Sequence, residues 1–306
     1  MKYSVVIPVF NSEKIVGHTI DNVVSFFRDK NLDFDVILVN DGSKDQSWEI
    51  ISKKAKEYPE LTAINLLHNY GQHVANLCGF CHATGDYVIT MDDDMQNPPE
   101  EIEKLIACAA SGHDLVIGEY IKKKHSLVRR LGSKIVRFLI RKIFFSPKNI
   151  ALSNFRIIRR DVIDRVCGHK SGYPYIPGLL LMYSSNVANV QVKHRERQAG
   201  KSNYRFRQIF NLVTEILFNY SSYPLRLVAG MGIIVAFFSF FLSLFYIMKA
   251  IFVGVGVPGW TTVVVLLSFF NGIALLILSM LGEYVVRSLT QTSQKEVYHI
   301  KEIIRG

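Results

Sequence analysis

Cysteine is scarce in this chain of 306 residues: there are four, and they are scattered. Four dispersed cysteines do not make the disulfide framework of a small secreted domain. Cys78 and Cys81 lie in CGFC, which matches a redox Cys-x-x-Cys, but they fall inside a predicted helix and not at its start. We therefore expect two small, half-buried thiols there. A signal peptide is also lacking before the apolar residues 3–10, so we expect the N-terminal part to be cytosolic.

Charged side chains are absent from two long stretches, residues 227–248 and 250–282. Each stretch can cross a bilayer as a helix of about 20 residues, and a pair of buried core helices is the alternative. Residues 254–260 between them carry no charge, whereas lysines and arginines flank both outer ends, which predicts that those ends are cytosolic. The expected organisation is a cytosolic domain, two transmembrane helices and a cytosolic tail, at residues 1–222, 223–286 and 287–306.

The N-terminal part of the chain contains a regular alternation of predicted strands and helices. Short apolar runs rich in β-branched residues predict strands at residues 3–9, 34–39, 61–67, 87–91 and 114–117. Helical spacing predicts helices at residues 13–29, 47–56 and 72–83, and another after Pro98. This alternation is typical of a mostly parallel α/β sheet covered on both faces. Ligands bind beyond the carboxyl ends of such strands, and polar stretches follow three of them: Asn11, residues 40–43 and Asp92–Gln96.

The stretch MDDDMQNPPE, residues 91–100, places three carboxylates in a row directly after a predicted strand. Adjacent like charges repel, and a divalent cation would neutralise them. Oxygen ligands suit Mg²⁺ or Mn²⁺, which bind through one or two carboxylates plus substrate phosphates. Alternate residues of an extended segment point the same way, so Asp92, Asp94 and Gln96 share a face and Asp93 points elsewhere. The spacing predicts a metal site open to a diphosphate.

Residues 126–145 form a predicted amphipathic helix. One face carries the basic residues Arg130, Lys134, Arg137 and Arg141. Such a helix suits a membrane surface with anionic lipid, and an ordinary surface helix is the alternative. Residues 205–222 form a second predicted interfacial helix. The net charge of +10 is also typical of nucleic-acid-binding proteins, but the basic residues cluster beside the hydrophobic runs, so we expect no nucleic-acid partner.

Several stretches are distinctive when they are taken together. They are SVVIPVFNSE (4–13), VNDGSKDQS (39–47), NYGQHVANLCGFCHATGD (69–86), MDDDMQNPPEEI (91–102), FRIIRRDVID (155–164), RERQAGKSNYRF (195–206) and MLGEYVVR (280–287). In these stretches the chain resembles the inverting glycosyltransferases of family two, in the branch that transfers sugars to polyprenyl phosphates. The resemblance implies a Rossmann-like domain of the GT-A type, followed by interfacial helices and a two-helix transmembrane hairpin. NYGQH and QNPPEEI favour the formamido-arabinose transferases within that family.

The resemblance also implies roles for individual residues. The nucleotide-binding residues would be Pro8, Phe10, Asn11, Glu13, Asp41, Gln72 and Asp93. The metal, Mg²⁺ or Mn²⁺, would be held by Asp92, Asp94 and Gln96. The lipid phosphate would be bound by Arg129 and Ser133. A loop closing on the diphosphate would contain Arg197, Gly200, Lys201, Ser202 and Tyr204. The catalytic residues would be Asp92, Asp94 and Arg197.

Three positions depart from the pattern of the family. The diphosphate loop usually reads GESKY, but here it reads GKSNY, so its lysine is Lys201 and position 203 is Asn203. Related chains often carry Asp where Asn154 stands, so we expect no acidic role there. Ile121 replaces an arginine expected near that position, and residues 122–124 are lysines.

The expected function is inverting transfer of a sugar from a nucleotide sugar, with UDP as the nucleotide, to undecaprenyl or another polyprenyl phosphate. The product would be a lipid-linked monosaccharide for a cell-envelope polysaccharide or for lipid A modification, made by a multi-pass protein of the bacterial inner membrane. The acceptor phosphate is already anionic, so catalysis would rest on positioning and on stabilising the leaving diphosphate.

Three alternatives remain at this point. The first is a formamido-arabinose transferase specifically. The second is a processive synthase that extends a glycan, which usually has a longer membrane pore and a Q-x-x-R-W segment that this sequence lacks. The third is a non-catalytic membrane scaffold, against which the intact D-x-D-x-Q argues. Small residues in the hydrophobic runs, Gly230, Gly232 and Gly272, would allow a homo-oligomer.

Overall fold

The structure is a computed structural model. It describes residues 1–120, 141–144, 147, 150–169, 172, 174–195 and 297–306, together with scattered positions between 213 and 288. The chain divides into two units, one made of Met1–Arg205 with Gln294–Gly306 and the other of Phe206–Ser293. Each unit is described by itself.

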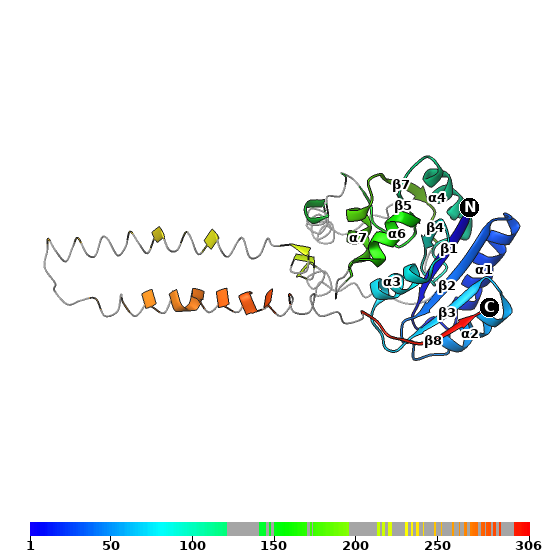
Figure 1. The fold of residues 1–306 in the computed structure, drawn as a ribbon, viewed down its shortest axis with the longest axis horizontal. Helices are drawn as coiled ribbons and strands as arrows, with labels where there is room; N and C mark the ends of the chain where they lie inside the picture. The colour runs from blue at the N-terminus through cyan, green and yellow to red at the C-terminus, as the bar shows by residue number, and fades with distance from the viewer. Residues whose placement is uncertain are drawn as a thin grey trace. The chain divides into compact units, whose positions relative to one another are not determined.

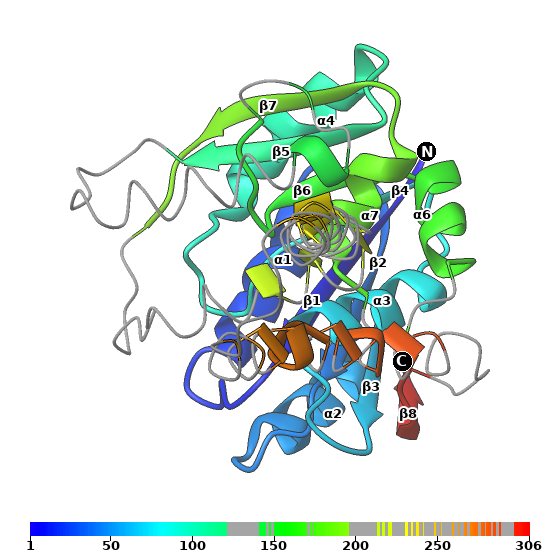
Figure 2. The same cartoon turned by 90° about the vertical axis from the view of Figure 1, so that its left-hand side faces the viewer.

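The first unit contains an eight-stranded sheet with the order β7-β5-β6-β4-β1-β2-β3-β8 (Figures 1 and 2). Its strands are β1 (Lys2–Val9), β2 (Asp33–Asn40), β3 (Leu61–Leu66), β4 (Tyr87–Thr90), β5 (Leu115–Tyr120), β6 (Arg156–Arg159), β7 (Val187–Val192) and β8 (Ile300–Arg305). β1 pairs in parallel with β2 and β4, and β2 with β3, as the alternation of strands and helices predicts. β6 runs antiparallel to β4 and β5, and β8 antiparallel to β3. The predicted mostly parallel sheet is therefore a mixed sheet.

Helices cover both faces of the sheet. They are α1 (Val16–Asp29), α2 (Ser47–Glu57), α3 (Gln72–His82), α4 (Ile102–Ala110), α6 (Arg160–Cys167) and α7 (Ile176–Tyr183), with a 3₁₀ turn, η1 (Pro99–Glu101). Alternate residues of β1 face opposite sides: Val5 and Ile7 belong to the core shared with α1, whereas Val6 meets α3. A Cβ at Gly79 would lie 2.3 Å from Val6 Cγ1, so glycine allows α3 to pack closely on the central strand.

The CGFC stretch lies inside α3, where the sequence places it. Its two thiols differ, because Cys78 is buried and Cys81 is exposed, and both are free. The prediction of two half-buried thiols is therefore wrong in detail. Gly79, which lies between the two cysteines, matters more for the fold, because its missing side chain allows α3 to pack closely on β1.

The C-terminal residues return to the sheet of the first unit. β8 pairs antiparallel with β3, with Thr62 opposite Arg305 and Leu66 opposite Ile300. Leu67 N donates a hydrogen bond to His299 O at 2.9 Å, which extends the pairing beyond the strand. The sequence predicts only a polar tail here, because IKEIIR has no clear alternation of apolar and polar residues. The tail residues 300–305 are in fact an edge strand.

The second unit holds the two predicted transmembrane runs. Its described residues are mostly helical, and many of its large apolar side chains are exposed, among them Phe237, Phe238, Leu267 and Leu278. In the part of the chain that the structure describes, no helix is both long enough and apolar enough to cross a bilayer. Most of residues 227–248 and 250–282 lies outside the described residues, as do most of the predicted interfacial helices 126–145 and 205–222.

Candidate active site

Three parallel strands, β1, β2 and β4, end at one edge of the sheet, and the polar stretches that follow them meet there. Asp41 N donates to Val9 O at 2.9 Å, and Met91 N donates to Val6 O at 3.3 Å. These bonds place the β1 loop (Phe10–Ile15), the β2 loop (Asp41–Gln46) and the acidic loop (Asp92–Gln96) side by side. This edge is where open α/β sheets bind ligands.

The Asp93 side chain points into the β1 loop. The acidic loop bends at residues 93–95, so it is not the extended segment on which the expected alternation of side chains depends. Its carboxylate accepts hydrogen bonds from Ser12 Oγ and, at 3.3 Å, from Phe10 N. Its backbone oxygen accepts from Thr19 Oγ1 at 2.9 Å. Burial raises the pKa of Asp93 to about 6, although the bond from Ser12 opposes this shift. In the structure Asp93 therefore braces the loop that carries the predicted nucleotide-binding residues.

Asp92 is held by two side-chain amides. Its Oδ1 accepts from Gln72 Nε2 at 2.7 Å and from Asn154 Nδ2 at 2.8 Å. Burial raises the pKa of Asp92, and the charge of Asp94 raises it further, whereas both amides and Arg156 lower it. Gln72, a predicted nucleotide-binding residue at the start of α3, thus contacts the predicted metal ligand directly.

Asp94 and Gln96 lie in a tight turn of the acidic loop. Gln96 N donates to Asp94 Oδ1 at 3.2 Å, and Met95 between them has a positive φ of 58°. Within the described residues, no group of three or more His, Cys, Asp or Glu side chains forms a ready metal cluster. Mg²⁺ does not require one, because it binds through one or two carboxylates plus substrate phosphates. Asp92 and Asp94, whose charges interact, together with the amide of Gln96 form a donor set that fits such a cation.

The β1 and β2 loops are joined by side-chain to backbone hydrogen bonds. Asn11, with φ of 50°, accepts from Lys44 N at 2.9 Å, and Glu13 Oε2 accepts from Gln46 N at 3.0 Å. Phe10 is exposed at the loop surface. Of the predicted nucleotide-binding residues, Phe10, Asn11 and Glu13 lie in the β1 loop beside the acidic loop, and Pro8 lies buried within β1.

Asp41 fixes the loop that precedes α3. Its two oxygens accept from Tyr70 N at 2.7 Å and from Gly71 N at 2.9 Å. Burial raises the pKa of Asp41, and the two backbone N–H groups oppose that shift. Gly42 has φ of 66°, and a Cβ there would lie 2.7 Å from Asn69 N, so only glycine fits. The carboxylate of Asp41, a predicted nucleotide-binding residue, is thus hydrogen-bonded to the protein backbone.

Two polar residues of this site, Asn154 and Arg156, are not predicted from the sequence. Arg156 is 2% exposed; its Nε donates to Thr90 Oγ1 at 3.1 Å and its Nη2 to Asn154 Oδ1 at 3.0 Å. Burial lowers the pKa of Arg156 to about 10, and the charge of Asp92 opposes this shift. The sequence does not single out the buried arginine, because three of the six residues in FRIIRR are arginines.

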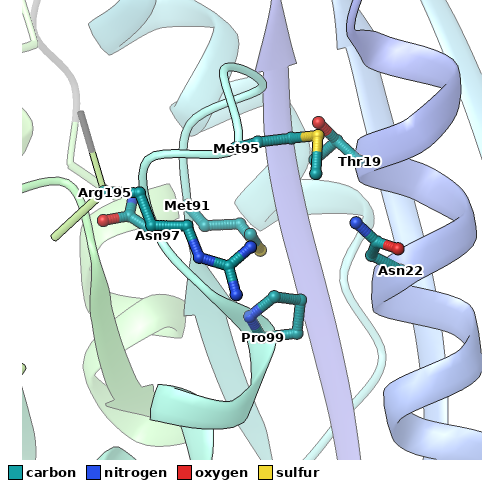
Figure 3. Close-up of a pocket in the computed structure, with 7 residues that line it drawn as sticks. All are labelled: Thr19, Asn22, Met91, Met95, Asn97, Pro99 and Arg195. Carbon is teal, nitrogen blue, oxygen red and sulfur yellow. The ribbon is translucent and has the colours of Figure 1, made fainter. Parts of the chain in front are cut away.

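A small pocket lies beside the acidic loop (Figure 3). It is lined by Thr19, Asn22, Met91, Met95, Asn97, Pro99 and Arg195. Arg195 N donates to Gln96 O at 2.9 Å, and its guanidinium group extends into the pocket near Pro99 (Figure 3). Arg195, two residues before the predicted diphosphate-loop residue Arg197, therefore lies beside the acidic loop.

Seven predicted site residues lie outside the described residues. Two are the lipid-phosphate residues Arg129 and Ser133. The others are the diphosphate-loop residues Arg197, Gly200, Lys201, Ser202 and Tyr204. Among the described residues, the structure brings the predicted nucleotide-binding and metal-binding residues together at one edge of the sheet.

A comparison against known families identifies the family of this chain. Residues 4–167, more than half of the chain, match the family described as Glycosyl transferase family 2. The chain belongs to glycosyltransferase family 2, and it is a glycosyltransferase. The resemblance drawn from the sequence stretches is confirmed.

Relatives similar over nearly the whole chain have a more specific name. The undecaprenyl-phosphate 4-deoxy-4-formamido-L-arabinose transferase of Pectobacterium carotovorum subsp. carotovorum is 33% identical over 305 residues, which cover 98% of this chain and 93% of the relative. The protein of the same name from Proteus mirabilis is 32% identical over 306 residues, with coverage of 99% and 94%.

A solved structure shares the fold of most of this chain. The glucosyl-3-phosphoglycerate synthase of Mycobacterium tuberculosis, in complex with Mn²⁺, UDP-glucose and phosphoglyceric acid, aligns with a TM-score of 0.54. The match covers 72% of this chain and 78% of the other, at 17% sequence identity. It shows the GT-A type α/β fold alone.

Proposed function

We propose that this glycosyltransferase transfers a sugar, with inversion, from a nucleotide sugar to undecaprenyl or another polyprenyl phosphate. The observation that carries this proposal is the full-length similarity to transferases named for undecaprenyl phosphate, combined with an acidic loop at the ligand-binding edge of the sheet. The names of those relatives favour 4-deoxy-4-formamido-L-arabinose as the sugar. UDP is the proposed nucleotide.

A divalent cation, Mg²⁺ or Mn²⁺, completes the proposed site. Asp92, Asp94 and Gln96 would hold it, and the solved relative that binds Mn²⁺ with a nucleotide sugar supports this choice. When bound, the cation neutralises charge on the diphosphate leaving group. Asp92 is held by two neutral side-chain amides, and its charge interacts with that of Asp94, so the pair supplies the negative charge that such a cation requires.

The chain's own residues position the two substrates. Asp93 stabilises the β1 loop through its hydrogen bond from Ser12. In this loop Phe10 has an exposed ring that can stack on the nucleotide, and Asn11 and Glu13 are held in place by hydrogen bonds to the β2 loop. Arg129 and Ser133 are proposed to bind the lipid phosphate. Arg197, Lys201, Ser202 and Tyr204 are proposed to close on the diphosphate, because Arg195, two residues before Arg197, lies beside the acidic loop. The acceptor phosphate attacks the sugar as an anion, so a general base is not needed.

The proposed location is the bacterial inner membrane, with two crossings between residues 223 and 286. Exposed phenylalanines and leucines in the second unit support contact with lipid. The pairing of β8 with β3 supports an even number of crossings, because residues on both sides of the apolar runs share one sheet and so must share one compartment. Flanking lysines and arginines favour the cytosol for that compartment.

The experiment that tests this function is direct. Incubate the purified full chain with undecaprenyl phosphate, Mn²⁺ and a panel of UDP-linked sugars, UDP-4-deoxy-4-formamido-L-arabinose among them, and identify the lipid product by mass. The expected product is one undecaprenyl-phosphate monosaccharide. Products that carry two or more sugars would favour a processive synthase, and the absence of any lipid product with all donors would refute the proposal.

A further inference from the structure

Arg156 is a buried cation behind the acidic loop. With 2% of its surface exposed, it is among the largest fully buried side chains of the described residues. Burying a charge is costly unless hydrogen bonds and an opposite charge compensate it. The two hydrogen bonds described for its guanidinium group go to neutral oxygens, Thr90 Oγ1 and Asn154 Oδ1.

Asn154 joins this cation to Asp92. Its Oδ1 accepts from Arg156 Nη2 at 3.0 Å and from Asn76 Nδ2 at 3.0 Å, and its Nδ2 donates to Asp92 Oδ1 at 2.8 Å. Its backbone oxygen accepts from Thr90 Oγ1. Two donors on the amide oxygen fix the orientation of the amide, because a flipped Asn154 would place its own donors against both of them.

The Asn154 amide also determines which oxygen of Asp92 accepts hydrogen bonds from the protein. A direct Arg–carboxylate pair is frequently bidentate and would occupy both oxygens of Asp92. In the described residues, the hydrogen bonds to the Asp92 carboxylate come from Gln72 and Asn154, and both go to Oδ1. Within the described part of the chain no hydrogen bond goes to the other oxygen, Oδ2, so it can accept a ligand. A carboxylate at position 154 could accept from Arg156 and Asn76, but it could not donate to Asp92.

We propose that Asn154 is a positioning residue of this site: it locks Asp92 with Oδ2 toward the metal and diphosphate, and it relays the buried positive charge of Arg156 to Oδ1. This inference rests on the proposed function for the identity of the metal–diphosphate ligand. Residues that hydrogen-bond to a metal ligand orient it, and their loss typically weakens metal affinity by about 10- to 100-fold.

The test measures Mn²⁺ binding, which does not depend on the acceptor. Titrate the purified full chain in detergent with Mn²⁺ in the presence of UDP, and follow free Mn²⁺ by electron paramagnetic resonance. Asn154→Ala is expected to weaken Mn²⁺ binding by about 10- to 100-fold. Sugar transfer by this variant is expected to recover at saturating Mn²⁺, because the fault lies in the position of the ligand.

Asn189→Ala is the matched control. The Asn189 side chain also makes three hydrogen bonds, donating to Ile117 O at 3.0 Å and Ala151 O at 3.1 Å and accepting from Ala151 N at 2.9 Å, but none of them reaches the acidic loop. This variant is expected to bind Mn²⁺ as the wild type does. Wild-type affinity in Asn154→Ala, or equal losses in the two variants, would overturn the inference.

Thr90→Val keeps the test decisive if Asn154→Ala does not fold. Valine matches threonine in shape, but it removes the hydroxyl that contacts both Arg156 Nε and Asn154 O. Weaker Mn²⁺ binding in this variant is expected, and unchanged binding would overturn the inference. If the wild type binds Mn²⁺ with UDP yet transfers no sugar to a polyprenyl phosphate, the proposed function fails while the role of Asn154 stands.

Discussion

The two halves of the sheet build their parts of the site in different ways. The nucleotide half (β1, β2, β3 and their loops) consists of parallel strands, and its carboxylates and amides bind backbone N–H groups of neighbouring loops. The acidic half (β4, β6, β5, β7) contains the antiparallel strand β6, which brings a buried arginine behind the acidic loop. In the nucleotide half the hydrogen bonds fix the conformation of the loops, whereas in the acidic half a buried positive charge lies behind the carboxylates of the acidic loop. Substitutions in the two halves should therefore have different consequences.

The largest effect is expected from Asp94→Ala, in the acidic half. It removes one of two carboxylates available to a cation, so we expect kcat to fall by at least about 100-fold while the thermal unfolding temperature stays unchanged. Asp93→Ala is the matched control, because its side chain bonds Ser12 and Phe10 in the nucleotide half. It should raise the KM for the nucleotide sugar more than it lowers kcat. Equal loss of kcat in both variants would remove the distinction between the halves.

The next effect concerns the lipid acceptor. Arg129→Ala should raise the KM for undecaprenyl phosphate by about 10- to 100-fold, as expected for a lost charge-assisted hydrogen bond of roughly 1.5–3 kcal/mol. The KM for the nucleotide sugar should stay the same. Arg137→Ala, in the same predicted helix, should lose only a salt-screened attraction of about 1 kcal/mol to anionic lipid. If both variants lose the same activity in neutral micelles, Arg129 has no specific role.

Two buried aspartates allow the halves to be compared by stability. Asp41 accepts two backbone N–H groups in the nucleotide half. Asp114 binds Ser185 N, Ser185 Oγ and Arg159 Nη1 at 2.9, 2.6 and 2.7 Å in the acidic half. Asp114→Asn should lower the free energy of unfolding by about 1.5–3 kcal/mol at neutral pH, because it loses hydrogen bonds to a charged group. Asp41→Asn should lower it less at neutral pH, because burial raises the pKa of Asp41 and so disfavours its charged form. Denaturant unfolding of the purified chain measures this.

The pH dependence of those two variants should have opposite signs. Burial opposes the shift at Asp114, but Ser185 and Arg159 lower its pKa below the usual value. Its contribution is therefore present above the unfolded pKa of about 3.9 and is lost as pH falls through the folded pKa. Burial raises the pKa of Asp41, so its contribution is present at acid pH and decreases as pH rises through the folded pKa. The stability gap between wild type and variant should thus shrink in acid for Asp114→Asn and widen for Asp41→Asn.

The smallest effect is expected where α3 packs on the nucleotide half. Gly79→Ala adds a Cβ only 2.3 Å from Val6 Cγ1, and such overpacking costs typically about 1–3 kcal/mol. Gly17→Ala in α1 is the control, because its Cβ would lie 3.6 Å from Ile50 Cγ2, an ordinary contact. We expect the unfolding temperature to fall for Gly79→Ala and to remain the same or rise for Gly17→Ala. The reverse order would mean that α3 can move away from β1.

The sequence predicted the nucleotide half better than the acidic half. β1, β2 and β3 are continuous apolar runs that end in turn residues, so both the strands and the position of Asp41 follow from periodicity. β6 was missed because RIIR is short and carries charge at both ends. For Asn154 the sequence predicts only the absence of an acidic role, because related chains often carry Asp at this position. Its hydrogen-bond partners Asp92 and Asn76 are 62 and 78 residues away in the chain. Hydrogen bonds over such separations leave no local pattern.

The strand β8 also constrains the order of events during synthesis. Its partner β3 ends at Leu66, but residues 300–305 leave the ribosome only after both apolar runs. At ~5–20 residues per second, the outer edge of β3 waits roughly 10–50 s for its partner. An unpaired edge strand is a template for pairing with other chains. The catalytic sheet of this protein is therefore completed only after the apolar runs have been made, and until then a nascent chain is exposed to aggregation along β3.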